Sequence, residues 1–247
     1  MKKVYLLIFL ISISLIAEGK NPLESPMFDT LIKSIVNETN YVFDNQNIII
    51  KVPDFADNPV QVPIFVDGTK IKNAKRLILI TDYNPIPNII DIKLYNLLPI
   101  FSTNIKIAQG TPLRVLILDD KNIWHIGSKN IKSNGGGCDI SSQISKNNEF
   151  EDFLGKIKIQ LFDKDNSTKI KSSIFHPMET GLVFGTTEFY INKITLKTNN
   201  NLLAEMSLTQ VISENPRFIF ETKEKIDNLT INFFDINGNN FNEKIEK

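Results

Sequence analysis

The sequence predicts an all-β protein made of two small β-sandwich domains in tandem, preceded by a short N-terminal helix. Short β-type stretches recur along most of the chain, separated by Pro, Asn, Asp and Gly residues. A glycine-rich segment divides them into two sets, and no long helical pattern interrupts either set. These features disfavour a doubly wound α/β fold and favour two sandwiches.

The first element is a short amphipathic helix within residues 25–40. Ser25 is a suitable N-cap residue, and Pro26 stands where the first helical residue is expected. The apolar residues at helical spacing are Phe28, Leu31, Ile32, Ile35 and Val36.

The strands fall into two sets on either side of a linker. The first set covers residues 48–52, 60–66, 76–81, 89–94, 105–109, 113–118 and 123–126, and the second set covers 156–162, 170–175, 187–198, 202–208, 217–221 and 229–235. Asn237-Gly238 is a strong hairpin-turn signal for the last strand pair. The predicted domains are residues 20–134 and 151–247, joined by a cysteine arm and linker at 135–150.

The N-terminus has the pattern of a secretory signal peptide. Lys2 and Lys3 precede an apolar run over residues 4–17, and Ala17-Glu18-Gly19 offers a small-x-small cleavage site. The run is shorter than the roughly 20 residues that span a bilayer, which argues against a retained anchor. We therefore expect residues 1–19 to be removed and the protein to be periplasmic.

The charge balance restricts the class of partner. The chain has 28 basic and 28 acidic side chains, so its formal net charge is zero. No basic field is available to hold nucleic acid or an anionic membrane surface. We therefore expect neither nucleic acid nor a membrane as a partner.

The only cysteine of the chain, Cys138, follows Gly135, Gly136 and Gly137. No intramolecular disulfide can form, which is unusual for an exported protein. A lone cysteine is commonly a small buried hydrophobe. A triple-glycine segment, however, has no strand or helix pattern and is mobile unless something holds it, so we expect a solvent-reachable thiol. No adjacent basic residue activates the thiol, so activation would have to come from a partner.

The remaining polar residues give little sign of catalysis or metal binding. His125 and His176 cannot build a zinc site with one cysteine at unrelated spacing. Asp163, Asp165 and Asn166 lack the glycine and distal glutamate of a calcium loop, so a hairpin turn is expected there. No phosphate loop, dinucleotide fingerprint or serine-hydrolase motif is present. We expect no catalytic residues, no metal and no cofactor.

Several strings of residues resemble a known pair of proteins. In the second half, His176-Pro177-Met178-Glu179-Thr180-Gly181 is followed by Glu214-Asn215-Pro216-Arg217-Phe218-Ile219-Phe220 and Phe234-Asp235-Ile236-Asn237-Gly238, an order that resembles SoxZ. In the first half, Ala56-Asp57-Asn58, Val62-Pro63-Ile64, Asn84-Pro85-Ile86-Pro87, Thr103-Asn104-Ile105-Lys106 and Gly136-Gly137-Cys138 resemble SoxY. The chain thus resembles a fused SoxYZ, whose two domains are immunoglobulin-like sandwiches.

The resemblance implies a function in sulfur oxidation. In this family the arm cysteine is the covalent attachment point for sulfur intermediates of thiosulfate oxidation. Carried over, Cys138 is the carrier thiol, Gly135, Gly136 and Gly137 give the arm its flexibility, and a covalent sulfur adduct on Cys138 is expected. The implied partners are Sox-type c-type cytochromes, a thiosulfohydrolase and a sulfane dehydrogenase.

One departure from the family concerns the arm. Cys138 is followed by Asp139-Ile140 and then the second domain, so the arm is tethered at both ends and lacks trailing glycines. A doubled loop needs a wider channel than a free tail. Fused carriers of this kind are similar to ones found beside quinoprotein dehydrogenases, which makes such a dehydrogenase system the alternative partner.

The His176–Gly181 string also has a structural interpretation. Gly181 would supply a positive φ and Glu179 would cap local amides. The alternative is that His176 and Glu179 help to form a docking surface for partners. Trp124 is expected in the core.

Three functions remain open from the sequence. The first is the covalent carrier. The second is a non-catalytic assembly or accessory module for a periplasmic quinoprotein dehydrogenase. The third is a thiol enzyme acting alone, which would need a base or a resolving cysteine near Cys138, and neither is identifiable.

Overall fold

The computed structural model describes residues 20–36, 40–138, 150–199 and 201–247. The predicted signal peptide, residues 1–19, and most of the predicted linker lie outside the described residues. No helix in the described part of the chain is long and apolar enough to cross a membrane.

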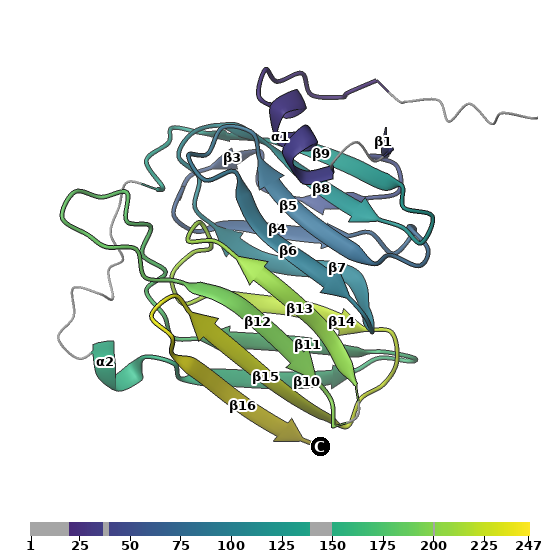
Figure 1. The fold of residues 1–247 in the computed structure, drawn as a ribbon, viewed down its shortest axis with the longest axis vertical. Coiled ribbons are helices and arrows are strands. Elements are labelled where there is room, and N and C mark those ends of the chain that lie inside the picture. Colours follow the sequence, from purple (N-terminus) through teal and green to yellow (C-terminus); the bar gives the residue numbers. More distant parts are fainter. Residues whose placement is uncertain (1–19, 37–39, 139–149, 200) are drawn as a thin grey trace, which may run out of the picture.

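The all-β prediction is confirmed: two β-sheets carry the fold (Figure 1). The ten-stranded sheet has the order β1 (Tyr41–Phe43), β9 (Trp124–Ser133), β8 (Thr111–Leu118), β5 (Arg76–Thr81), β6 (Asn88–Leu94), β13 (Leu202–Leu208), β12 (Ile191–Lys197), β15 (Asn228–Asp235) and β16 (Asn240–Glu246), and β3 (Phe55–Ala56) pairs with β9. The six-stranded sheet has the order β10 (Ile157–Asp163), β11 (Thr168–Ile174), β14 (Arg217–Thr222), β7 (Leu97–Ile105), β4 (Val62–Asp67) and β2 (Ile49–Lys51). Two short helices, α1 (Phe28–Val36) and α2 (Phe150–Phe153), complete the described elements.

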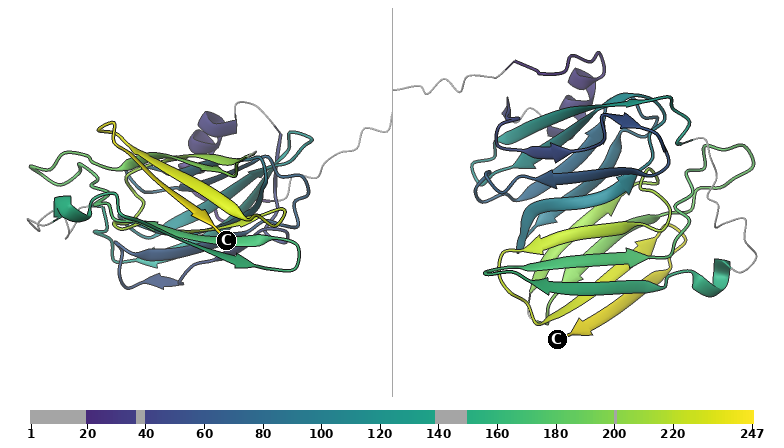
Figure 2. Two further views of the ribbon diagram at one scale, coloured as in Figure 1. Left: turned by 90° about the horizontal axis from the view of Figure 1, so that it is seen from below. Right: turned by 180° about the vertical axis from the view of Figure 1, so that it is seen from behind.

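Both sheets run through both halves of the chain. In the larger sheet β6 pairs antiparallel with β13, and in the smaller sheet β7 pairs antiparallel with β14. In Figure 1 the blue and teal strands of the first half lie directly above the green and yellow strands of the second, and Figure 2 shows the two sheets as layers. The two sandwiches are therefore joined edge to edge.

The core is continuous across this junction. Strand β7 alternates strictly between buried and half-buried residues, as a strand with one face toward the core does. Phe101 of β7 lies with its ring centroid 6.2 Å from that of Phe218 and 5.8 Å from that of Phe220, both on β14. Aromatic packing thus links the first half to the second.

Helix α1 covers the outer face of the larger sheet. Its buried residues Phe28, Ile32 and Val36 pack in a separate cluster that includes Trp124 at the start of β9. Trp124 is 3% exposed, which confirms its predicted core position. The helix begins at Phe28, two residues after Pro26, and the Ser25 hydroxyl accepts a hydrogen bond from the Met27 amide.

One predicted strand is wrong. The strand expected at 105–109 is instead β7, which ends at Ile105. Pro99 lies inside β7, and a proline signals against a central strand because it lacks an amide donor. Here β4 pairs with β7 only from Ile100 onward, and the register with β14 shifts between Phe220 and Thr222, so the ladder accommodates Pro99. Because the strand ends there, the carbonyls of Ile107 and Ala108 accept hydrogen bonds from the cysteine arm.

Candidate functional site around Cys138

The glycine arm is held by backbone hydrogen bonds. The Gly136 amide donates to the Ala108 carbonyl at 3.0 Å, and the Gly137 amide donates to the Ile107 carbonyl at 2.9 Å. Cys138 is 0% exposed. The prediction of a solvent-reachable thiol is therefore wrong for this structure, because residues remote in sequence supply acceptors for the arm. We call residues 135–138 in this position the docked arm.

Gly137 fits where no other residue would. A Cβ atom added to it would lie 2.2 Å from the Pro59 carbonyl oxygen and 2.4 Å from the Ile107 carbonyl oxygen. Both are backbone atoms that cannot turn away as a flexible side chain can. The Ile107 amide itself donates to the Pro59 carbonyl at 2.9 Å, which fixes the two segments against each other. The docked arm thus depends on close backbone approach, one of the uses of glycine.

The second half of the chain also contacts the arm. The Thr180 hydroxyl donates to the Cys138 carbonyl at 3.1 Å. Thr180 belongs to the His176–Gly181 string, whose Glu179 forms an antiparallel bridge with Phe189. Gly181 has a φ of +69°, so its predicted positive dihedral is confirmed. The docked arm therefore lies between the two halves and is bonded to both.

Lys106 is buried beside the docked thiol, and its side chain is a site residue that sequence reasoning missed. Lys106 is 4% exposed, and its ammonium group donates to the Met178 carbonyl and, at 3.2 Å, to the Gln210 carbonyl. Burial lowers the pKa of Lys106 to about 8. The charges of Glu179, Cys138 and Glu214 favour the ammonium form and offset part of this effect.

His176 is buried next to Lys106 and is neutral at physiological pH. Burial lowers the pKa of His176 to about 4; Asp235 opposes this shift and Lys106 adds to it. Its Nδ1 accepts a hydrogen bond from the Met178 amide at 3.1 Å, which places the proton of the neutral ring on Nε2. Nε2 lies 3.7 Å from a carboxylate oxygen of Asp235.

Two residues have a positive φ where the His176–Gly181 string meets the Glu214–Phe220 string. Met178 and Asn215 have φ values of 50° and 49°, in a region that residues other than glycine seldom adopt. The Asn215 amide donates to the His176 carbonyl at 2.8 Å, and the His176 amide donates to the Asn215 side chain at 3.2 Å. Such backbone outliers cluster at functional sites and persist because their surroundings hold them.

The other predicted site residues are placed as follows. His176 is 0% exposed and Glu179 is 6% exposed, so neither forms an exposed docking surface while the arm is docked, and their role toward partners stays a prediction. His125 lies elsewhere, with Nδ1 2.8 Å from Asp44 and Nε2 3.4 Å from Asp119. Within the described ranges, no three His, Cys, Asp or Glu side chains are grouped to hold a metal ion.

The buried His176 makes the free energy of unfolding depend on pH. Between pH 6.5 and about pH 4, histidine in the unfolded chain binds a proton that His176 in the folded chain does not. The free energy of unfolding should therefore fall as the pH is lowered through this range, by about 3 kcal/mol for this group. Urea unfolding at pH 7, 5.5 and 4 measures it. The decrease should be smaller by that amount in His176→Gln but persist in His125→Gln; equal decreases in all three proteins would contradict the assignment.

Comparisons with known proteins match each half of the chain to a different family model. Residues 32–138 match the family model of the sulfur oxidation protein SoxY, and residues 158–246 match that of the sulphur oxidation protein SoxZ. A comparison with curated proteins found no match. Among solved structures, the sulfur carrier protein SoxY from Chlorobium limicola f thiosulfatophilum is 21% identical, covers 44% of this chain and 96% of its own, and has a TM-score of 0.40. On the two family models, the chain belongs to the SoxY and SoxZ families, as a SoxY domain followed by a SoxZ domain in one fused, SoxYZ-like polypeptide.

Proposed function

We propose that this protein is a periplasmic sulfur carrier that holds sulfur intermediates as covalent adducts on Cys138. The observation that carries the proposal is the position of the only cysteine: it follows three glycines and is the last residue of the SoxY match. The chain itself catalyses nothing in this proposal. Partner enzymes form and process the adduct.

The docked arm defines two positions of the thiol. In the docked position Cys138 is shielded from solvent and from oxidants. The hydrogen bonds that join the arm to other segments include those donated by the Gly136 and Gly137 amides and the one donated by the Thr180 hydroxyl. Each such bond contributes about 0.5–1.5 kcal/mol net, so these three together contribute a few kcal/mol. A partner that binds the released arm can supply that amount, so the carrier exposes its thiol only when a partner loads or processes the cargo.

The chemistry of loading restricts the partner. Joining the Cys138 thiolate to a sulfur anion through an S–S bond releases two electrons, which a redox partner must accept. A c-type cytochrome, as the resemblance implies, meets this need. A thiosulfohydrolase and a sulfane dehydrogenase would then process the adduct of a thiosulfate pathway. Because residue 138 is followed by the second domain, the arm enters a partner as a loop, which supports a quinoprotein dehydrogenase system as the alternative.

Mass spectrometry of protein taken rapidly from the periplasm tests the proposal. Wild type and Cys138→Ala are compared, intact and as peptides, before and after mild reductant. We expect a reductant-sensitive mass addition confined to the Cys138 peptide, and an N-terminus at Lys20 if residues 1–19 are removed. A thiol that is uniformly unmodified in sulfur-oxidising cells would contradict the carrier proposal.

A second candidate follows from the burial of Cys138. A thiol that stays docked would have a structural role as a buried side chain. The protein would then act as an assembly or accessory module for a periplasmic dehydrogenase. Cells that carry Cys138→Ala distinguish the two. Loss of sulfur oxidation with retained partner binding supports the carrier, whereas unchanged oxidation supports the accessory module.

A further inference from the structure

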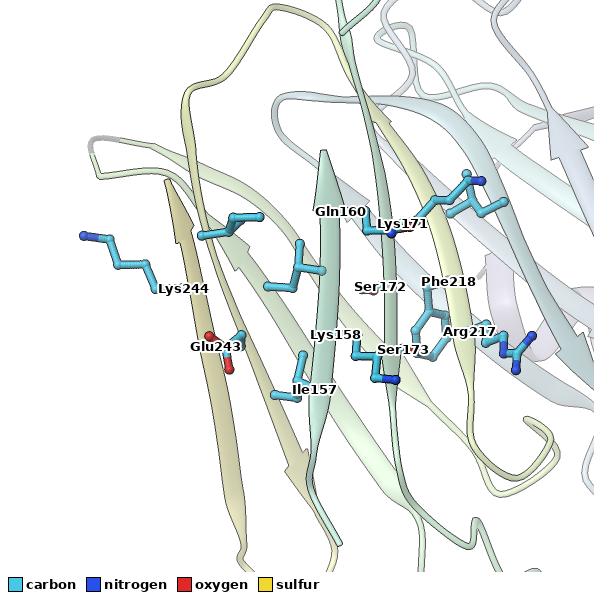
Figure 3. A pocket seen from close by; sticks show the side chains of 13 residues that line it. Ile157, Lys158, Gln160, Lys171, Ser172, Ser173, Arg217, Phe218, Glu243 and Lys244 are labelled. Atoms are coloured by element: carbon cyan, nitrogen blue, oxygen red, sulfur yellow. The ribbon is translucent and has the colours of Figure 1, made fainter. Parts of the chain in front are cut away.

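A groove of about 840 Å³ opens between the two sheets at the end of the second half (Figure 3). Its sides are β10 and β16, the last strands of the two sheets. Half-buried isoleucines line it, with Ile157 and Ile159 on β10 and Ile245 on β16. These isoleucines form an apolar slit beside two strand edges, and polar side chains, among them Lys158, Gln160 and Glu243, line the rest of the groove.

The edge of β10 is open to a further strand. In the described part of the chain, β10 pairs with β11 on one side, and no strand pairs with its other side. The strand alternates between half-buried residues that face the slit, such as Ile157 and Ile159, and exposed residues, such as Lys158 and Gln160. A free edge with this alternation leaves backbone donors and acceptors available to an extended peptide.

The outer face beside this edge is positively charged. Lys158, Ser173 and Arg217 are register partners across β10, β11 and β14, so they lie in one row. Figure 3 shows the Lys158 and Arg217 side chains on the side of β10 away from β16. Among the described residues neither Lys158 nor Arg217 forms an ion pair, whereas Lys244 on β16 is paired with Glu246. The two cations of this row are therefore available to pair with acidic side chains of a partner.

We propose that the free edge of β10 adds one strand from a partner protein, an extended segment in which apolar and acidic residues alternate. Apolar side chains of that segment would enter the slit, and acidic ones would lie beside Lys158 as cross-strand neighbours. Seven residues of β10 span about 23 Å, which sets the length of the added strand. The Gly155 amide, just before β10, bonds to the Phe175 carbonyl at 2.9 Å, so the start of β10 is tied to the residue that precedes the His176–Gly181 string.

Binding of a model strand tests the proposal. The probe is a fluorescein-labelled nine-residue peptide of alternating valine and glutamate, titrated by fluorescence anisotropy with the purified protein. Lys158→Glu should weaken binding about tenfold. Lys197→Glu, an exposed residue of β12 with the same charge change, should leave the Kd within twofold. Hydrogen exchange should show peptide-induced protection of the β10 amides.

Several results would overturn the proposal. These are the absence of saturable binding, equal Kd values for Lys158→Glu and wild type, or protection outside β10. A lysine that only keeps an edge strand from aggregating would give the first result. Dimers of the protein alone, joined through β10 and seen by sedimentation, would identify a second copy as the occupant. Cys138→Ala should bind the peptide as wild type does, so failure here is distinct from failure of the carrier function.

Discussion

Replacing Arg114 with methionine should lower the free energy of unfolding by about 3–5 kcal/mol. Arg114 and Asp82 form an ion pair at 2.8 Å with both side chains 0% exposed. Methionine fills much of the volume but leaves the Asp82 carboxylate buried without its counter-ion. Breaking one side of a buried pair is more damaging than losing an exposed pair, because the remaining charge has no water to replace its partner.

Arg114 also holds the N-terminal segment against the sheet. Its guanidinium donates to the Leu23 carbonyl at 2.6 Å and to the Asn21 side chain at 3.0 Å, and it lies 4.8 Å from the centroid of the Phe28 ring. The loss should therefore reach beyond one pair of charges. In Arg114→Met, residues 20–28 should exchange their amide hydrogens faster than in wild type.

Arg76→Met is the matched control for this prediction. Arg76 forms a 2.5 Å ion pair with Asp91, but the two side chains are 38% and 32% exposed. Such a pair contributes at most about 1 kcal/mol, so urea unfolding should show a much smaller loss. If Arg114→Met and Arg76→Met lost equal free energy of unfolding, the burial of the Arg114–Asp82 pair would not account for its contribution to stability. Adding Asp82→Asn to Arg114→Met should recover part of the stability.

The strands themselves were largely predictable from the sequence. The predicted bounds of β5 and β13 match the structure, because alternation and flanking turn residues mark a strand locally. The join of the two halves was not predictable. Periodicity tells which face of a strand is buried, but it does not tell which neighbour pairs with its edge. The pairing of β6 with β13 therefore appears only in the structure.

The candidate site was predictable in its parts but not in its arrangement. The three glycines, Cys138 and the His176–Gly181 string were all visible in the sequence. The burial of Cys138 was not, because the acceptors for the Gly136 and Gly137 amides are the carbonyls of Ala108 and Ile107, some thirty residues earlier. The sequence predicts a strand at 105–109, and strand carbonyls are expected to bond within a sheet. The carbonyls of Ile107 and Ala108 were therefore not expected to bond the arm. Lys106 belongs to the same segment, and lysine is almost never fully buried, so sequence alone gave no reason to place it beside the thiol.

Replacing Gly137 with alanine should release the arm and raise the rate of Cys138 alkylation by N-ethylmaleimide about 100-fold. The added methyl group would lie within 2.4 Å of two backbone oxygens, those of Pro59 and Ile107, so the docked position becomes unfavourable. A 100-fold change corresponds to about 2.7 kcal/mol of docking free energy. The rate reports this equilibrium because a buried thiol reacts from the released state, and opening is fast relative to alkylation.

Gly136→Ala is the control that separates a clash from backbone strain. Gly136 has a φ of +86°, but a Cβ atom added there meets nothing within 4 Å. Its alanine variant should therefore carry only the conformational penalty of about 1–2 kcal/mol, which corresponds to about a tenfold faster reaction. In urea all three proteins should react at one rate, since the intrinsic thiol is the same. If the folded wild type already reacts as fast as Gly137→Ala, the arm is released in solution, and the shielding ascribed to the docked arm does not operate.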